Sequence, residues 1–82
     1  MKITIYSTAT CPYCVMVKRW LDERSISYDD VRVDSDQQAA EKMIKLSGQM
    51  SVPFTTVERD DGMIEKILGF DIANLQRVLG VQ

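Results

Sequence analysis

Apolar and polar residues alternate along four short stretches of the chain, as expected for strands with one buried face. The first stretch covers residues 2–6, and the second covers residues 28–33, where Val31 and Val33 share one face. The third and fourth, residues 54–57 and 63–67, flank Asp60-Asp61-Gly62, which is a hairpin turn signal. The pattern therefore predicts four strands, the last two joined as a hairpin.

Three other segments carry apolar residues at helical spacing. The first helix is expected to begin at Pro12, whose fixed φ suits a first turn, and to fade near Ser25. The second covers residues 37–47, between N-cap candidates in residues 34–36 and a stop at Gly48. The third follows Asp71, an N-cap residue, and ends at Gly80.

A few side chains in these helices have a predicted role in packing. Trp20 is expected to pack its helix against the sheet, and Met43 to fill the core. The charged residues Lys18, Arg19 and Arg24 are expected to form a solvated face.

The order of elements, β-α-β-α-β-β-α, predicts an α/β fold with a four-stranded mixed sheet and helices on both faces. The chain has 82 residues, which suits a single domain spanning residues 1–82. Its net charge is −2, and no basic patch points to nucleic acid or to an anionic membrane. No signal peptide or membrane-spanning run is evident, so we expect a cytoplasmic protein without membrane association.

The two cysteines stand together in Thr10-Cys11-Pro12-Tyr13-Cys14, between the first strand and the first helix. This spacing in a strand-to-helix context is typical of a dithiol redox site. A purely structural disulfide is an alternative, although closing so short a loop would stabilise the fold by only about 2 kcal/mol. Zinc binding is another, but the chain has no histidine, and two cysteines are half of a closed zinc site.

Cys11 is expected at or just before a helix N-terminus. Unpaired amides and the positive end of the helix dipole stabilise an anion there, so the Cys11 thiol should ionise more readily than a free cysteine. Cys14 is expected one turn further inside the helix.

Three motifs at these separations resemble the glutaredoxin and NrdH-redoxin branch of the thioredoxin fold. They are Cys11-Pro12-Tyr13-Cys14 after the first strand, Val52-Pro53 before the third, and Gly69-Phe70-Asp71 after the fourth. The resemblance covers essentially the whole chain and implies a dithiol-disulfide oxidoreductase that reduces protein disulfides.

The resemblance implies a role for each motif. Cys11 would be the nucleophile and Cys14 the resolving thiol, with Thr10, Pro12 and Tyr13 completing the active-site loop. The bond before Pro53 would be cis, leaving the backbone of Val52 to pair with an extended substrate segment. Gly69, Phe70 and Asp71 would complete the substrate-binding surface.

The chain departs from glutathione-using glutaredoxins in two motifs. Those glutaredoxins often carry a basic residue at the position where this chain has Thr8. They also often carry two glycines with paired aspartates at the position where this chain has Gly69-Phe70-Asp71. Gly-Phe is instead similar to the NrdH-redoxins, which take electrons from thioredoxin reductase, although Asp71 is able to receive a γ-glutamyl amine. Lys42 and Lys45 are the nearest bases that could replace the missing cation.

We therefore expect no bound cofactor, and electrons from an NADPH-dependent flavoprotein of the thioredoxin reductase type, with glutathione as the alternative. Ribonucleotide reductase and peroxiredoxin are possible disulfide substrates, and we expect the protein to be a monomer.

Two other interpretations of the sequence stay open. One is a module in which two protomers share a metal or iron–sulfur cluster through Cys11, and the other is an interaction domain with inert cysteines.

Overall fold

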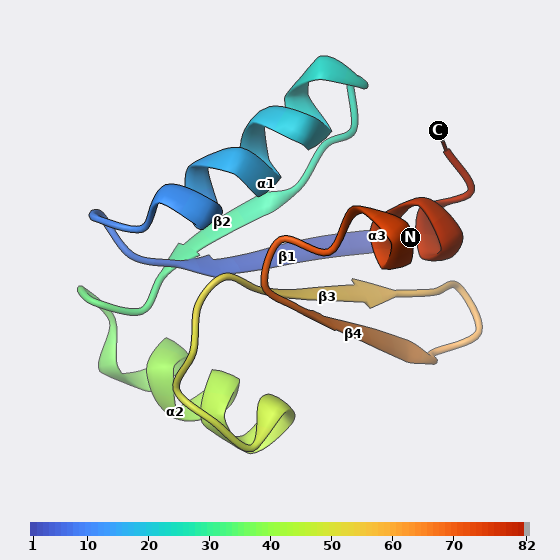
Figure 1. The fold of residues 1–82 in the computed structure, drawn as a ribbon. Coiled ribbons are helices and arrows are strands. Elements are labelled where there is room, and N and C mark those ends of the chain that lie inside the picture. The colour runs from blue at the N-terminus through green and yellow to red at the C-terminus, as the bar shows by residue number, and fades with distance from the viewer. Residues whose placement is uncertain (82) are drawn as a thin grey trace.

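A computed structural model describes residues 1–81 as three helices and four strands. The expected order β-α-β-α-β-β-α is confirmed (Figure 1). The elements are β1 (Lys2–Ser7), α1 (Pro12–Glu23), β2 (Asp29–Arg32), α2 (Gln37–Ser47), β3 (Phe54–Glu58), β4 (Ile64–Leu68) and α3 (Ile72–Leu79).

The four strands form one sheet in the order β2-β1-β3-β4. β1 pairs in parallel with β2 and antiparallel with β3, and β3 pairs antiparallel with β4. The sheet is therefore mixed, as predicted. Tyr6 lies opposite both Val31 and Phe54, and Phe54 lies opposite Leu68, which aligns the ends of all four strands near the start of α1.

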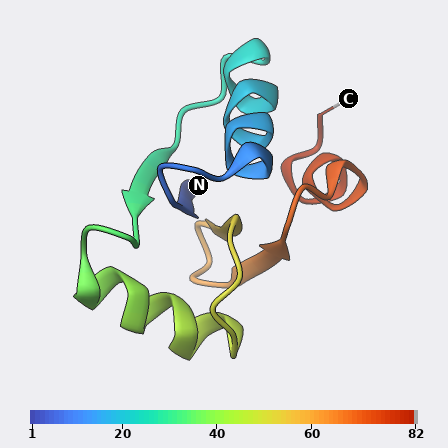
Figure 2. The ribbon, with the colours of Figure 1, turned by 60° about the vertical axis from the view of Figure 1, so that its left-hand side comes forward.

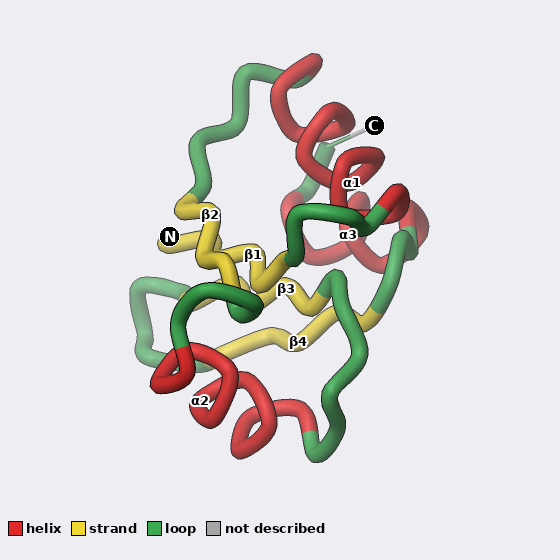
Figure 3. The backbone as a smooth tube through the Cα atoms, turned by 90° about the vertical axis from the view of Figure 1, so that its left-hand side faces the viewer, coloured by secondary structure: helices red, strands yellow, loops and turns green. Residues whose placement is uncertain are grey.

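The helices cover the two faces of the sheet unequally. α1 and α3 lie on one face and α2 alone lies on the other, as the view along the strands shows (Figure 3). Turning the molecule leaves α2 on its own side of the sheet, away from α1 and α3 (Figure 2). The prediction of helices on both faces is confirmed.

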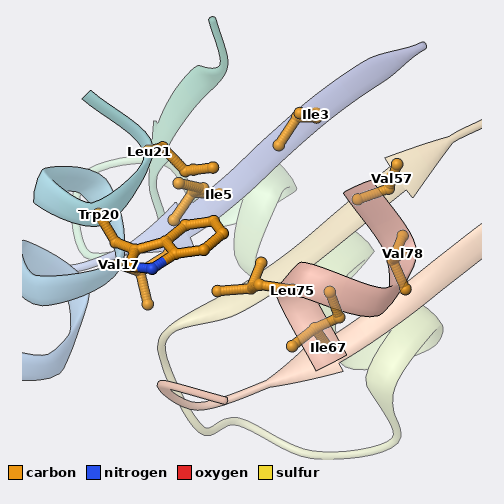
Figure 4. Packing of buried hydrophobic residues seen from close by; sticks show 9 residues of the cluster. All are labelled: Ile3, Ile5, Val17, Trp20, Leu21, Val57, Ile67, Leu75 and Val78. Carbon is orange, nitrogen blue, oxygen red and sulfur yellow. The ribbon is translucent and has the colours of Figure 1, made fainter. Parts of the chain in front are cut away.

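The larger hydrophobic cluster lies between the sheet and the α1/α3 pair (Figure 4). Alternate strand residues supply one side of it, because side chains two apart point to the same face. Trp20 is buried in it, so its predicted packing role is confirmed. Its buried members are Ile3, Ile5, Val17, Trp20, Leu21, Val57, Ile67, Leu75 and Val78.

A smaller cluster joins α2 to the opposite face. Met43 is buried there against Tyr6 and Phe54, so the prediction of a core methionine is confirmed. The rings of Tyr6 and Phe54 stack with centroids 5.8 Å apart. Partly buried side chains close the cluster, namely Val31, Val33, Leu46 and Val52.

The structure corrects the start of the last strand. We expected it to cover residues 63–67, but β4 runs from Ile64 to Leu68. Met63 belongs to the turn, where its backbone N–H donates to the Asp61 side chain at 3.0 Å. The predicted helix boundaries at Asp71, Gly48 and Gly80 are confirmed as N-cap and left-handed C-cap residues.

The predicted solvated face of α1 is wrong for two of its three residues. Lys18 pairs with Asp30 of β2 at 3.0 Å. Arg24 lies over the Trp20 ring, 4.0 Å from its centroid, and donates to the Trp20 carbonyl. Arg19 is exposed, as expected. Helical periodicity locates the outer face of α1 but does not reveal that β2 and an indole ring lie within reach of its long side chains.

Candidate active site around Cys11 and Cys14

Cys11 and Cys14 are joined in a disulfide at the start of α1, with their Cα atoms 5.2 Å apart. Cys11 is the N-cap residue in extended conformation, and Pro12 occupies the first helical position. Proline suits that position because its fixed φ matches a helix and its missing donor is not needed there. The predicted placement of Cys11 at a helix N-terminus is therefore confirmed.

The two sulfur atoms have different surroundings. Cys14 is 0% exposed, whereas Cys11 is partly exposed. The backbone N–H of Cys14 donates to Sγ of Cys11 at 3.1 Å. A sulfur at this position receives both a hydrogen bond and the positive end of the helix dipole, and each favours a negative charge on it.

Three segments distant in sequence meet beside this disulfide because of the strand register. Tyr6 at the end of β1 lies opposite Phe54, and Phe54 lies opposite Leu68. The residues that follow β1, precede β3 and follow β4 therefore share one end of the sheet. The Gly69 N–H donates to the Pro53 carbonyl at 2.8 Å, which ties the last two segments together.

The peptide bond between Val52 and Pro53 is cis, as predicted. Pro53 is buried, while Val52 is partly exposed. Within residues 1–81 the backbone N–H and C=O of Val52 have no hydrogen-bond partner. An extended segment of another molecule could pair with these groups as an added strand would.

Gly69 adopts φ 71°, a conformation that glycine takes without steric cost. Phe70 is half-buried and packs against the larger hydrophobic cluster. Asp71 caps α3, because its carboxylate accepts from the Asn74 backbone at 3.1 Å and from the Asn74 side chain at 2.7 Å. Both carboxylate oxygens of Asp71 are thus engaged within the chain.

Tyr13 is 60% exposed, and Thr10 and Pro12 are exposed with it, so the active-site loop stands at the surface. Thr8 is partly buried at the start of this loop. Lys42, suggested above as a replacement cation, instead lines a cavity with Lys2 and Glu58, which stand at the opposite end of β1 and β3.

Asp34, which the sequence suggested only as an N-cap candidate, holds the loop before Cys11 instead. Its carboxylate accepts from the Ala9 backbone N–H at 3.0 Å and pairs with the Arg32 guanidinium at 2.8 and 2.7 Å. The hydrogen bonds from Arg32 and Ala9 hold the pKa of Asp34 well below its ordinary value. The cap itself is Asp36, which accepts from the Ala39 N–H.

A second carboxylate ties β1, β2 and α1 together below the loop. Asp30 accepts from the buried Ser7 hydroxyl at 2.6 Å and from the Lys18 ammonium at 3.0 Å. Burial alone would raise the pKa of Asp30, but the hydrogen bonds from Ser7 and Lys18 outweigh it and lower the pKa. The parallel pairing of β1 and β2 is the signal that could have located both carboxylates, because it places their carboxyl ends at one edge.

Within residues 1–81, no three histidine, cysteine, aspartate or glutamate side chains cluster as ligands for a metal ion. No helix in the same range is long and apolar enough to cross a bilayer.

Comparison with known proteins identifies the family. The glutaredoxin family model matches residues 3–60. The chain belongs to the glutaredoxin family. It is 39% identical over 77 residues to a glutaredoxin-like 8.6 kDa protein in the rubredoxin operon of Clostridium pasteurianum, covering 94% of this chain and 96% of that protein.

Solved structures of related proteins share the fold. A mutant of the thioredoxin-like protein BC3987 superposes with a TM-score of 0.86 at 31% identity, covering 99% of this chain and 97% of that one. NrdH-redoxin from Escherichia coli superposes with a TM-score of 0.78 at 27% identity, covering 95% of each chain. The predicted thioredoxin-like, glutaredoxin-type fold is confirmed.

This glutaredoxin-family protein is a thiol-disulfide oxidoreductase with a redox-active pair, Cys11 and Cys14. Proteins of the family act on disulfide substrates together with a reductant, and they need no bound cofactor. The exchange chemistry therefore belongs to the two sulfur atoms.

Proposed function

We propose that Cys11 is the attacking thiolate and Cys14 the resolving thiol in the reduction of protein disulfides. The observation that carries this assignment is the difference between the two sulfurs. Cys11 is partly exposed and accepts a helix N-terminal N–H, whereas Cys14 is fully buried. An exposed sulfur with a stabilised charge is the better nucleophile, and a buried one is reached only after the first bond has formed.

The reaction proceeds in two exchanges. The Cys11 thiolate attacks one sulfur of the substrate disulfide, forms a mixed disulfide and releases the other substrate sulfur as a thiolate that takes up a proton. The Cys14 thiol then loses its proton and attacks the Cys11 sulfur, which releases the second substrate thiol. Two electrons pass to the substrate, and the Cys11–Cys14 disulfide remains.

The substrate segment lies along Val52 in this proposal. The backbone groups of Val52, unpaired within residues 1–81, supply hydrogen bonds, and the exposed Tyr13 and half-buried Phe70 supply apolar contact. Ribonucleotide reductase and peroxiredoxin are of the required substrate class, and the reaction suits a reducing compartment such as the cytoplasm.

Single cysteine variants test the order of attack. Cys14→Ser should accumulate a mixed disulfide with a peptide disulfide substrate, because the resolving thiol is absent, while turnover falls to background. Cys11→Ser should neither form the adduct nor turn over. Mass spectrometry of the intact protein detects the adduct, and an adduct found only with Cys11→Ser would reverse the two roles.

The reductant in this proposal is a flavoprotein of the thioredoxin reductase type, which draws electrons from NADPH. The chain has Thr8 where a cation would hold a glutathione carboxylate, and the nearby Arg32 is already paired with Asp34. Asp71 is engaged in capping α3. NrdH-redoxin from Escherichia coli, a structural relative, is described as a glutaredoxin-like protein with a thioredoxin-like activity profile.

The test supplies each reductant to the oxidised protein and follows dithiol formation. We expect faster reduction by thioredoxin reductase and NADPH than by millimolar glutathione. Thr8→Lys should increase the rate with glutathione about tenfold, the effect of one charge-assisted contact of about 1.4 kcal/mol. Met63→Lys is the matched control, because it adds the same charge in the hairpin turn at the other end of the sheet.

Rapid reduction by glutathione without any reaction with thioredoxin reductase would instead make this protein a conventional glutaredoxin. Anaerobic absorption spectra and metal analysis of the purified protein test the metal-sharing alternative, in which a dimer would show stoichiometric metal or iron–sulfur bands.

A further inference from the structure

The face of the sheet covered by α2 carries an open cavity away from the cysteines. Two adjoining hollows between α2 and the sheet share Lys2, Thr4, Tyr6 and Lys42 in their walls. Lys2, Thr4 and Tyr6 are alternate residues of β1, so they point to one face. Lys42 approaches from the flank of α2. The hollows run along β1 from Lys2 to Tyr6, and they are distinct from the redox site because they lie on the α2 face of the sheet, opposite α1 (Figure 3).

All four shared residues are hydrogen-bond donors. Thr56, opposite Thr4 in the sheet, adds a third hydroxyl to those of Thr4 and Tyr6. Within residues 1–81, none of these hydroxyl or ammonium groups has a hydrogen-bond or ion-pair partner. The cavity thus collects donors that no other group in residues 1–81 accepts from.

Among these groups, Tyr6 gives the strongest evidence for a ligand. Its side chain is only 3% exposed and its ring is held against Phe54. Within residues 1–81 the Tyr6 hydroxyl has no hydrogen-bond partner. It is nevertheless accessible to solvent, because the side-chain polar atom that is both sealed and unpaired in these residues belongs to Thr55. Because this hydroxyl reaches the cavity, water or a ligand can supply the hydrogen-bond partner that residues 1–81 do not. Burial raises the pKa of Tyr6, so its hydroxyl stays a donor at neutral pH.

The charges on the walls favour a small anion. Each hollow has the two lysines and one carboxylate, Glu58 in one and Asp29 in the other. The carboxylates stand in separate hollows, whereas both lysines belong to the shared part. A compact oxyanion in the shared part would therefore meet two ammonium groups and several hydroxyls, a donor set that suits phosphate.

We propose that the cavity formed by Lys2, Thr4, Tyr6, Lys42 and Thr56 binds a phosphate group, either as inorganic phosphate or as a small phosphomonoester. The hydroxyls of Thr4, Tyr6 and Thr56 donate to its oxygens, and the two lysines balance its charge. Asp29 and Glu58 oppose the anion from either side and limit affinity, so binding is weak and sensitive to ionic strength. The site does not depend on the redox state of the cysteines.

The experiment follows amide chemical shifts of the folded protein during titration with sodium phosphate, at pH 7 and at constant ionic strength set with sodium chloride. We expect saturable shifts centred on Thr4, Tyr6 and Thr56. A parallel titration with glycerol phosphate distinguishes the two sources of the group, since tighter binding of the ester would point to a phosphomonoester ligand.

Three variants localise the contact. Tyr6→Phe keeps the ring and removes only the hydroxyl, and it should weaken phosphate binding about fivefold, the effect of one neutral hydrogen bond. Lys42→Gln should weaken it about tenfold. Lys45→Gln removes the same charge from the same helix but lines neither hollow, so its affinity should stay within about twofold of the parent.

Shifts that rise linearly without saturation, or an equal loss of affinity in Lys42→Gln and Lys45→Gln, would overturn the proposal and indicate general attraction of the ion to α2. Unchanged affinity in Tyr6→Phe would also overturn it, because the proposed role of the Tyr6 hydroxyl would be absent. Circular dichroism of each variant establishes that the fold is retained.

Discussion

The two faces of the sheet use the same strands but are covered very differently. On the α1/α3 face, two helices close over a cluster of buried apolar residues that includes Ile5, Leu21 and Leu75. On the α2 face, the buried hydrophobic residues of the described chain are Met43, Tyr6 and Phe54, and polar residues line the space beside them. A single helix is about 10 Å across and cannot cover four strands spaced almost 5 Å apart.

The two faces therefore contribute differently to stability and to binding. The fully buried face provides most of the apolar stabilisation and holds α1, and with it Cys14, in a fixed position. The α2 face has room for hydroxyl and ammonium groups, because water or a ligand reaches them. One face therefore holds the redox pair in position, while the other leaves space for a binding site.

Leucine truncations should give the largest contrast between the faces. Leu75→Ala, on the α1/α3 face, should lower the free energy of unfolding by about 2–5 kcal/mol, because Leu75 is fully buried. Leu46→Ala, in α2, should cost about 1 kcal/mol, because Leu46 is only partly buried. Urea denaturation measures both, and equal losses would break the comparison.

Adjacent threonines on β3 offer a finer contrast. The Thr55 hydroxyl points to the α1/α3 face, where it is sealed and has no hydrogen-bond partner in the described part of the chain, so Thr55→Val should stabilise the protein by about 1 kcal/mol or more. Thr56 points to the α2 cavity, where its hydroxyl can meet water. Thr56→Val should therefore change stability by less than about 0.5 kcal/mol. Thermal unfolding compares the two, and a destabilised Thr55→Val would mean that its hydroxyl has a partner in solution.

The smallest effect should come from the polar contacts at the edge that the two faces share. Asp34→Asn removes the pairing with Arg32, and its cost in stability should be present at pH 7 and shrink as the pH falls below 3.8. The sign follows because the pKa of Asp34 is lowered in the folded protein, so the contribution is lost as the carboxylate is protonated. Glu41→Gln, which removes an exposed carboxylate of α2, controls for the change in net charge.

Stability measured from pH 7 to pH 3 tests this dependence. A difference between Asp34→Asn and the parent that stayed constant over the range would show that Asp34 acts by packing rather than by charge. A cost equal to that of Leu75→Ala would contradict the ranking of the apolar face above the polar edge.

Local sequence rules located the elements and the redox pair well, because each depends on neighbours in the chain. Pro12 after Cys11 marks a helix start whatever surrounds it, and Gly48 marks a helix end. The start of β4 was missed by one residue, since the Asp61 side chain captures the Met63 amide in the turn. The cis bond at Pro53 came from the family resemblance, because proline permits that isomer without specifying it.

The sequence by itself determined the order of elements, the position of Cys11 at a helix start and the family of the chain. Only the tertiary structure decided what lies beside the cysteine loop and which face stays open. Strand pairing brings Asp34 to Ala9 and Asp30 to Ser7, across more than twenty residues of chain. Packing buries the ring of Tyr6, yet its hydroxyl has no hydrogen-bond partner within residues 1–81. Contacts between distant segments depend on register and on how fully a helix covers a sheet, and neither quantity is encoded by local periodicity.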